Sequence, residues 1–129
     1  MAEKQARAII FRGKSDMARN RGQWVYGSLV TGLNGKYEIW YEQAGRMKKN
    51  PVVKYTIGQN TGFKDRSGKD IYEGDIVFDG MFNLGPVTWD KIQTGFYVDG
   101  LECPMLSDIA WEILGNIHDN HELLGDEDG

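Results

Sequence analysis

Apolar and polar residues alternate with a period of two along much of the chain, a pattern typical of half-buried β-strands. The clearest case is the stretch 36–43, where Tyr37, Ile39 and Tyr41 share one face and mostly charged residues share the other. Similar stretches, rich in β-branched and aromatic residues, recur between glycine-containing turns. The pattern predicts strands over 7–11, 23–31, 36–43, 52–57, 76–78, 86–89, 95–98 and 111–117. The chain is therefore expected to be mainly β.

Turn-forming residues separate these predicted strands. Asn34-Gly35 is the strongest short hairpin signal, because both residue types accept the positive φ of a tight hairpin turn. The stretch 65–68 begins with Asp and ends with Gly, which favours another tight turn, and Asp79-Gly80 ends the strand at 76–78. The polar stretch 13–22 and the basic stretch 44–50 are interpreted as exposed loops.

One or two short helices are expected beside the strands. Ser107 and Asp108 are suited to cap a helical turn near residue 105, and Asn120 is suited to cap a last helix that runs through Leu124. The stretch 109–114 fits a helix as well as a strand, so both interpretations stay open there.

The stretch 57–77, IGQNTGFKDRSGKDIYEGDIV, combines turn and strand signals within a short span. Its glycines suit turns because glycine takes a positive φ without a Cβ clash. The strand-forming residues Ile76 and Val77 follow directly after Gly74-Asp75. A glycine-punctuated hairpin followed by such a strand is common in small β-barrels, where glycine permits a sharp bend.

This stretch resembles the YopX family, which consists of small proteins of bacteriophages and prophages. The matching blocks, in the family's order, are 24–29, 58–77, and 114–117 followed by 122–124. One departure is His121, where the family often has proline, and this departure concerns only the local turn. The resemblance implies a β-rich fold with an SH3-type barrel and additional N-terminal strands, in a cytoplasmic phage or prophage protein. It implies no catalytic residues, because the family has none established.

The length of 129 residues favours one domain, a single YopX-like domain over 1–129. A softer division near residue 55 would separate an N-terminal sheet from a barrel-like half. No apolar stretch reaches the roughly 18 residues that span a bilayer, and the N-terminus lacks the apolar region of a secretory signal. Cys103 is the only cysteine, so no intrachain disulfide can form, which fits the reducing cytoplasm of a bacterial host.

Charge is divided unevenly along the chain. Residues 1–70 carry 14 Lys and Arg against 6 Asp and Glu, a net charge of +8, whereas residues 71–129 carry Lys91 alone against 13 acids, a net charge of −12. Such asymmetry favours complementary association of the two halves, within one chain or between subunits. A basic face for nucleic acid is the alternative.

Two histidines and one group of acidic residues were weighed as metal sites. His118 and His121 stand three residues apart, a spacing that can share a metal on a helix. A closed site needs about four ligands, so a solvated helix end is favoured. Asp65, Ser67, Asp70 and Glu73 resemble part of a calcium loop, but the glycine and the spacing of an EF-hand are absent, so turn chemistry is favoured.

Carboxylates are numerous in the second half, and two of them in one cleft could perform general acid–base catalysis. Abundance alone does not place them in a cleft, and a solvated strand edge is favoured instead. The motifs of serine hydrolases, phosphate-binding loops, dinucleotide-binding loops and zinc proteases are absent from the sequence. We therefore expect no enzyme, no cofactor and no metal site. The carboxylates concerned are Asp70, Glu73, Asp75, Asp79 and Asp90.

Aromatic residues gather on two neighbouring predicted strands, and cations follow closely in sequence. Rings between cations would suit single-stranded nucleic acid, whereas a barrel core or an oligomer interface uses aromatic residues just as heavily. We favour a core or interface role and keep nucleic acid as the alternative. The candidate binding surface comprises Trp24, Tyr26, Trp40, Arg46, Lys48 and Lys49.

Together these observations predict a non-enzymatic phage or prophage accessory protein that acts by binding other proteins. Its expected partners are further copies of itself, in a homo-oligomer, and an unidentified phage or host protein. The alternative is a nucleic-acid-binding small-barrel module that uses the basic N-terminal half.

Overall fold

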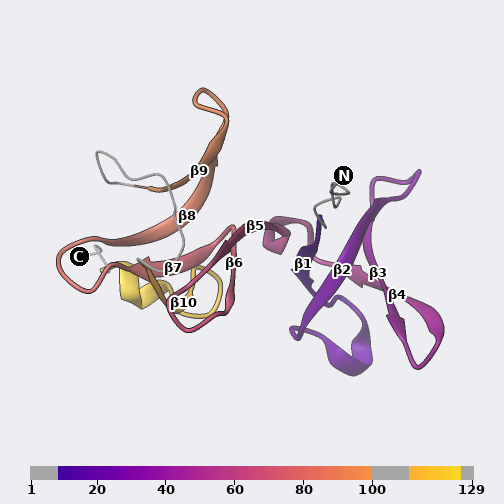
Figure 1. Cartoon of the computed structure of the whole chain (residues 1–129). Helices are drawn as coiled ribbons and strands as arrows, with labels where there is room; N and C mark the ends of the chain where they lie inside the picture. The colour runs from indigo at the N-terminus through magenta and orange to yellow at the C-terminus, as the bar shows by residue number, and fades with distance from the viewer. Residues whose placement is uncertain (1–8, 100–110, 126–129) are drawn as a thin grey trace, which may run out of the picture. The chain divides into compact units, whose positions relative to one another are not determined.

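A computed structural model describes residues 9–99 and 111–125 (Figure 1). The chain forms two compact units, unit 1 over Met1–Gln59 and unit 2 over Asn60–Gly129. All strand pairs are antiparallel, and the helical elements described are three single 3-10 turns, η1 (Ala18–Asn20), η2 (Lys54–Thr56) and η3 (His121–Leu124). The prediction of a mainly β chain with short helices is therefore confirmed. Within the described ranges, no helix is long and apolar enough to cross a membrane.

Unit 1 is a sheet with its strands in the order β4-β3-β2-β1, followed by the start of β5. From β1 to β4 each strand pairs with the next along the chain, and the first residues of β5 return to pair with β1. The loop between β1 and β2 contains η1. The strands are β1 (Phe11–Lys14), β2 (Trp24–Thr31), β3 (Tyr37–Gln43), β4 (Arg46–Val52) and β5 (Gly58–Lys64).

The core of unit 1 lies on one side of this sheet. Val25, Ile39 and Val52 are buried there, and partly buried apolar side chains such as Tyr37 and Tyr41 pack against them. The alternation predicted for 36–43 is confirmed, since Ile39 has no exposed surface whereas its neighbour Trp40 is 36% exposed. The hydrophobic period therefore decides which side of β3 packs inward.

A buried polar triangle fixes the loop that follows β1. The Asn50 amide nitrogen donates to Ser15 Oγ at 2.7 Å, and Ser15 Oγ donates to Asn20 Oδ1 at 2.6 Å. The Asn20 amide nitrogen closes the triangle on Asn50 Oδ1 at 3.3 Å. Ser15 and Asn50 are almost fully buried, so these bonds satisfy polar groups that water does not reach.

The loop predicted over 44–50 is wrong. Ala44 and Gly45 form a two-residue turn with φ of 53° and 77°, and β4 begins directly after it at Arg46. Positive φ at both central residues is the geometry of the tight hairpin turns that match strand twist. The basic residues Arg46, Lys48 and Lys49 therefore stand on a paired strand rather than in a loop.

Unit 2 holds the remaining strands. From Asn60 onward β5 pairs with β6, and the other four strands form a sheet in the order β10-β7-β8-β9. Its core consists of Ile71, Val77, Val87, Val98 and Trp111. The strands are β6 (Asp70–Tyr72), β7 (Asp75–Phe78), β8 (Leu84–Asp90), β9 (Gly95–Val98) and β10 (Glu112–Asn116).

Asp65 ties the predicted turn at 65–68 to β10. Its Oδ1 accepts the backbone N–H groups of Ser67 at 2.8 Å and Lys69 at 2.9 Å, and its Oδ2 accepts that of Ile113 at 3.2 Å. Burial raises the pKa of the Asp65 carboxyl, but these three N–H donors and the nearby Lys69 charge outweigh it, so the net pKa is lowered. The buried carboxylate is thus a structural hydrogen-bond acceptor.

Other sequence predictions are adjusted in detail. The first strand covers Phe11–Lys14 rather than 7–11, of which 7 and 8 lie outside the described residues, and the stretch 52–57 leaves the sheet at Val52 and turns through η2. The last helix is confirmed as the single 3-10 turn η3, but the Asn120 side chain does not cap it and instead accepts the Asn116 N–H at 3.1 Å. The strand predicted over 111–117 covers Glu112–Asn116. The helical turn near 105 and Cys103 lie outside the described residues. Among the described residues the strands form open sheets rather than a closed barrel, so the SH3-type barrel stays a prediction.

Candidate binding surface

The strand register of unit 1 gathers aromatic and cationic side chains on the side of the sheet opposite its core. Residues that face each other across an antiparallel pair share one face. Lys14 lies opposite Trp24 and Arg12 opposite Tyr26, and Trp40 lies opposite both Ser28 and Lys49. We call this side the outer face, which carries Arg12, Lys14, Trp24, Tyr26, Glu38, Trp40, Lys49 and Pro51.

Cations lie over both indole rings of the outer face. The Arg12 guanidinium is 4.4 Å and the Lys14 ammonium 5.3 Å from the centroid of the Trp24 ring. The Lys49 ammonium is 5.7 Å from the Trp40 ring centroid. Arg12 is only 6% exposed, so its contact with Trp24 is largely desolvated. The contacts of the two lysines contribute about 0.5–1 kcal/mol each, and all three contacts restrict the rings. The tryptophans are therefore presented in defined orientations.

Trp40 is held from a second direction by Glu38. The indole Nε1–H donates to Glu38 Oε1 at 3.0 Å. The backbones of β2 and β3 approach closely at this point. A Cβ on Gly27 would lie 2.2 Å from the Trp40 carbonyl oxygen. Only glycine therefore permits the spacing that places Trp40 at this point of the outer face.

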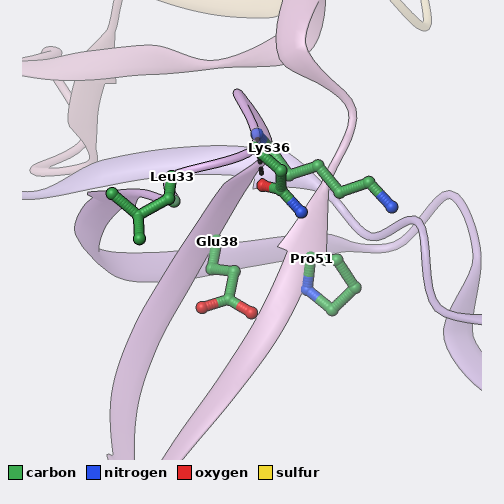
Figure 2. A pocket seen from close by; sticks show the side chains of 6 residues that line it. Leu33, Lys36, Glu38 and Pro51 are labelled. Atoms are coloured by element: carbon green, nitrogen blue, oxygen red, sulfur yellow. Dashed lines mark hydrogen bonds between the residues drawn. The ribbon is translucent and has the colours of Figure 1, made fainter.

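A hollow continues the outer face toward the β2–β3 hairpin (Figure 2). Glu38 and Pro51 lie directly opposite each other, and the hairpin residues Leu33 and Lys36 complete its rim. The hairpin is closed by Gly32 N–H donating to the Lys36 carbonyl at 2.7 Å, and the side chain of Asn34 accepts the Lys36 N–H at 3.1 Å. The hairpin predicted at Asn34-Gly35 is confirmed, with a loop longer than two residues. The lining residues are Gly32, Leu33, Asn34, Lys36, Glu38 and Pro51.

The structure brings together four of the six predicted surface residues and separates two. Trp24, Tyr26, Trp40 and Lys49 share the outer face, whereas Arg46 lies opposite Gln43 and Lys48 lies opposite Tyr41, on the other side of β4. The predicted set is corrected in this respect, because neighbouring residues of a strand point to opposite faces.

Sequence reasoning missed Arg12 and Lys14. The stretch 13–22 was interpreted as a loop, which hid the alternation of Phe11, Arg12, Gly13 and Lys14 along β1. The period-two pattern FRGK, with cations at both even positions, is the signal that could have found them.

The carboxylates weighed as catalytic groups mostly accept backbone N–H groups. Asp75 Oδ2 accepts the Tyr72 N–H at 2.7 Å, and Asp90 Oδ1 accepts those of Ile92 and Gln93 at 2.9 and 3.2 Å. Asp70 forms an exposed ion pair with Lys64 at 2.6 Å. The solvated strand edge favoured from sequence is wrong for Asp75, which is buried, whereas Asp70 is exposed.

Both histidines lie among the described residues, near the end of the chain. The His118 backbone N–H donates to Asn116 Oδ1 at 2.9 Å, and His121 begins η3. Across residues 9–99 and 111–125, no group of three or more His, Cys, Asp or Glu side chains has the arrangement of a metal site.

Comparison with known proteins identifies the relatives of this chain. The family described as YopX protein matches residues 11–125. The crystal structure of protein EF1440 from Enterococcus faecalis is similar in fold, with a TM-score of 0.59 and 18% sequence identity over 92% of this chain and 99% of that chain. Among curated proteins, none matches significantly. The family match covers nearly the whole described chain, which confirms the resemblance seen in the sequence.

Proposed function

The chain belongs to the YopX family, and from the composition of its outer face we propose that it is a non-enzymatic binding module. It binds proteins, including further copies of itself, and acts as a phage or prophage accessory protein in the cytoplasm of a bacterial host. The single observation that carries this proposal is the group of exposed aromatic residues on one sheet face beside a hollow.

The outer face has the composition of a protein-binding hot spot. Tyr26 is 46% and Trp40 is 36% exposed, although large aromatic side chains gain more than most from burial. Trp, Tyr and Arg are the residue types that dominate binding energy at protein interfaces. The exposed aromatic side chains of the outer face can insert into a partner, and the hollow beside them can accept a side chain of the partner.

Charge favours another copy of the chain as one partner. Unit 1 carries 11 Lys and Arg against 4 Asp and Glu, whereas unit 2 carries 4 against 15. The net charges are therefore +7 and −11. Opposite charges of this size steer two copies toward a contact between unit 1 of one copy and unit 2 of the next.

Single-stranded nucleic acid is the second candidate ligand for the same face. Lys14 lies over Trp24, which is the pairing of stacking ring and phosphate-binding cation used by such proteins, whereas Arg12, over the same ring, is buried. Two features rank it second. The ring faces of Trp24 and Trp40 already contact cations, and Glu38 and Glu42 on β3 would repel phosphate.

A tagged pull-down from cells that carry the phage, at moderate salt, separates the two candidates. We expect a stoichiometric protein partner, or untagged copies of the chain, to be retained after nuclease treatment. Co-eluting nucleic acid that is lost steeply as salt rises would instead replace the protein-binding proposal with the nucleic-acid one, because phosphate contacts release counterions.

A further inference from the structure

Unit 2 presents two large apolar side chains at the tip of one hairpin. The loop 79–83 joins β7 to β8, and within it Met81 is 71% and Phe82 is 85% exposed. Two neighbouring exposed apolar side chains of this size are a candidate contact site. We call residues 79–83 the Asp79 loop.

The Asp79 loop is held in one conformation by its first residue. Asp79 Oδ1 accepts the backbone N–H groups of Met81 at 2.9 Å, Phe82 at 3.1 Å and Asn83 at 3.0 Å. The Asn83 side-chain nitrogen donates to Asp79 Oδ2 at 2.8 Å, and the Asp79 N–H donates to the Asn83 carbonyl at 3.0 Å. A loop ordered before binding loses less conformational entropy on binding, so it suits insertion into a partner.

The backbone N–H donors also stabilise the negative charge of the Asp79 carboxylate at the base of the loop tip. Hydrogen bonds from Met81 and then Asn83 lower the pKa of the Asp79 carboxyl, and the bond from Phe82 adds to them. The tip is therefore an apolar pair of side chains beside an ionised carboxylate, and the Arg66 guanidinium also lies next to the loop, because a Cβ on Gly80 would be 3.1 Å from its Nη2.

The hollow of unit 1 has complementary chemistry. Leu33 and Pro51 give it apolar walls, and Lys36 gives it a cation at the rim (Figure 2). Leu33 is fully exposed, which leaves its apolar surface available to an incoming side chain. The hollow also carries the Glu38 carboxylate, so its lining offers one cation and one anion beside the apolar walls (Figure 2). The match with the tip is therefore made by the apolar side chains, with Lys36 as the cation that faces an incoming carboxylate.

From this match we propose that the Asp79 loop of one copy inserts Phe82 into the hollow of a second copy. The inference rests on the self-association in the proposed function and names the two surfaces that meet. Because the loop and the hollow are different patches, the contact is heterologous, and repetition of it gives a closed ring or an open chain of subunits.

Two single variants and their mixture test this contact in sedimentation velocity. Phe82→Asp removes the tip and keeps the hollow, whereas Leu33→Asp damages the hollow and keeps the tip. Each variant alone is expected to associate at least about 30-fold more weakly than wild type, the effect of losing one hot-spot residue. The equimolar mixture is expected to form a 1:1 complex, because one intact loop and one intact hollow remain.

Ile92→Asp is the matched control, because Ile92 is 88% exposed at the turn between β8 and β9 and carries no role in the proposed contact. It is expected to associate like wild type. Wild-type association that Phe82→Asp leaves unchanged would overturn this inference and leave the proposed self-association standing. A wild-type chain that is monomeric throughout the micromolar range would overturn both.

Discussion

Lys49 lies directly opposite Trp40 across β3 and β4, with its ammonium group 5.7 Å from the centroid of the indole ring. Its sequence neighbour Lys48 lies opposite Tyr41 and so belongs to the other face. Two adjacent lysines with the same charge thus differ only in the face of the sheet that they occupy. This difference makes them a matched pair for testing the outer face.

Lys49→Glu is expected to weaken self-association by about 10-fold or more, because it replaces an attractive charge beside Trp40 on the outer face with a repulsive one. Lys48→Glu makes the same change in net charge on the opposite face and is expected to have a smaller effect. Isothermal titration or sedimentation equilibrium measures both. Equal effects of the two variants would mean that only overall charge matters and that the outer face is not the contact.

Gly27→Ala is expected to destabilise unit 1. The added Cβ would lie 2.2 Å from the Trp40 carbonyl oxygen, so β2 and β3 must separate. Overpacking of this kind typically costs about 1–3 kcal/mol in the free energy of unfolding, which urea denaturation measures. Ser28→Ala, at the next and exposed position, is the control and should stay within about 0.5 kcal/mol of wild type. An unchanged Gly27→Ala protein would contradict the close approach of the strands.

The lowered pKa of Asp65 makes the stability of unit 2 depend on pH. Its pKa in the folded chain is lowered below the ordinary value of 3.8. The carboxylate therefore stabilises the fold fully above that ordinary value, and its contribution is lost as the pH falls through the lower, folded-state pKa. Urea unfolding from neutral pH to about pH 3 should show this loss in wild type.

Asp65→Asn removes the charge that three backbone N–H groups share. It is expected to unfold about 2–3 kcal/mol more easily at neutral pH, since hydrogen bonds to charged groups contribute about 1.5–3 kcal/mol each and Asn keeps part of them. Its stability should also decline less in acid than that of wild type. Asp70→Asn, which removes only an exposed ion pair, should cost about 0–1 kcal/mol. A pH profile of Asp65→Asn identical to wild type would contradict the role of this carboxylate.

The sequence predicted those parts of the fold that depend on local chemistry. Strict alternation placed Ile39 inward and Trp40 outward, and the Asp65 and Asn34-Gly35 turns were recognisable from residue type alone. These features need only the period of a strand and the φ preferences of glycine and asparagine. The family could also be recognised, and the match over 11–125 confirms it.

The parts that the sequence did not predict depend on pairing between strands. Ala44 has a φ of 53°, a conformation that alanine rarely adopts. The residue types of the two-residue turn, which places Lys49 beside Trp40, therefore give only a weak sequence signal for a hairpin. Asn50 reads as a loop residue, yet it is buried because Ser15 and Asn20 satisfy its amide. Arg12 joins the candidate surface only through its register with β2. Register is set by the whole sheet and not by any one stretch.

Sedimentation equilibrium of the wild-type chain and of Trp40→Ala, across micromolar concentrations at moderate salt, tests the central claim most directly. Trp40 is partly exposed, so its removal should leave the fold intact, as circular dichroism can verify. The outer-face account predicts that wild type associates reversibly and that Trp40→Ala associates about 30-fold more weakly, the expected loss for a hot-spot tryptophan. A folded Trp40→Ala protein that associates as wild type does, or a wild-type chain that stays monomeric, would contradict it.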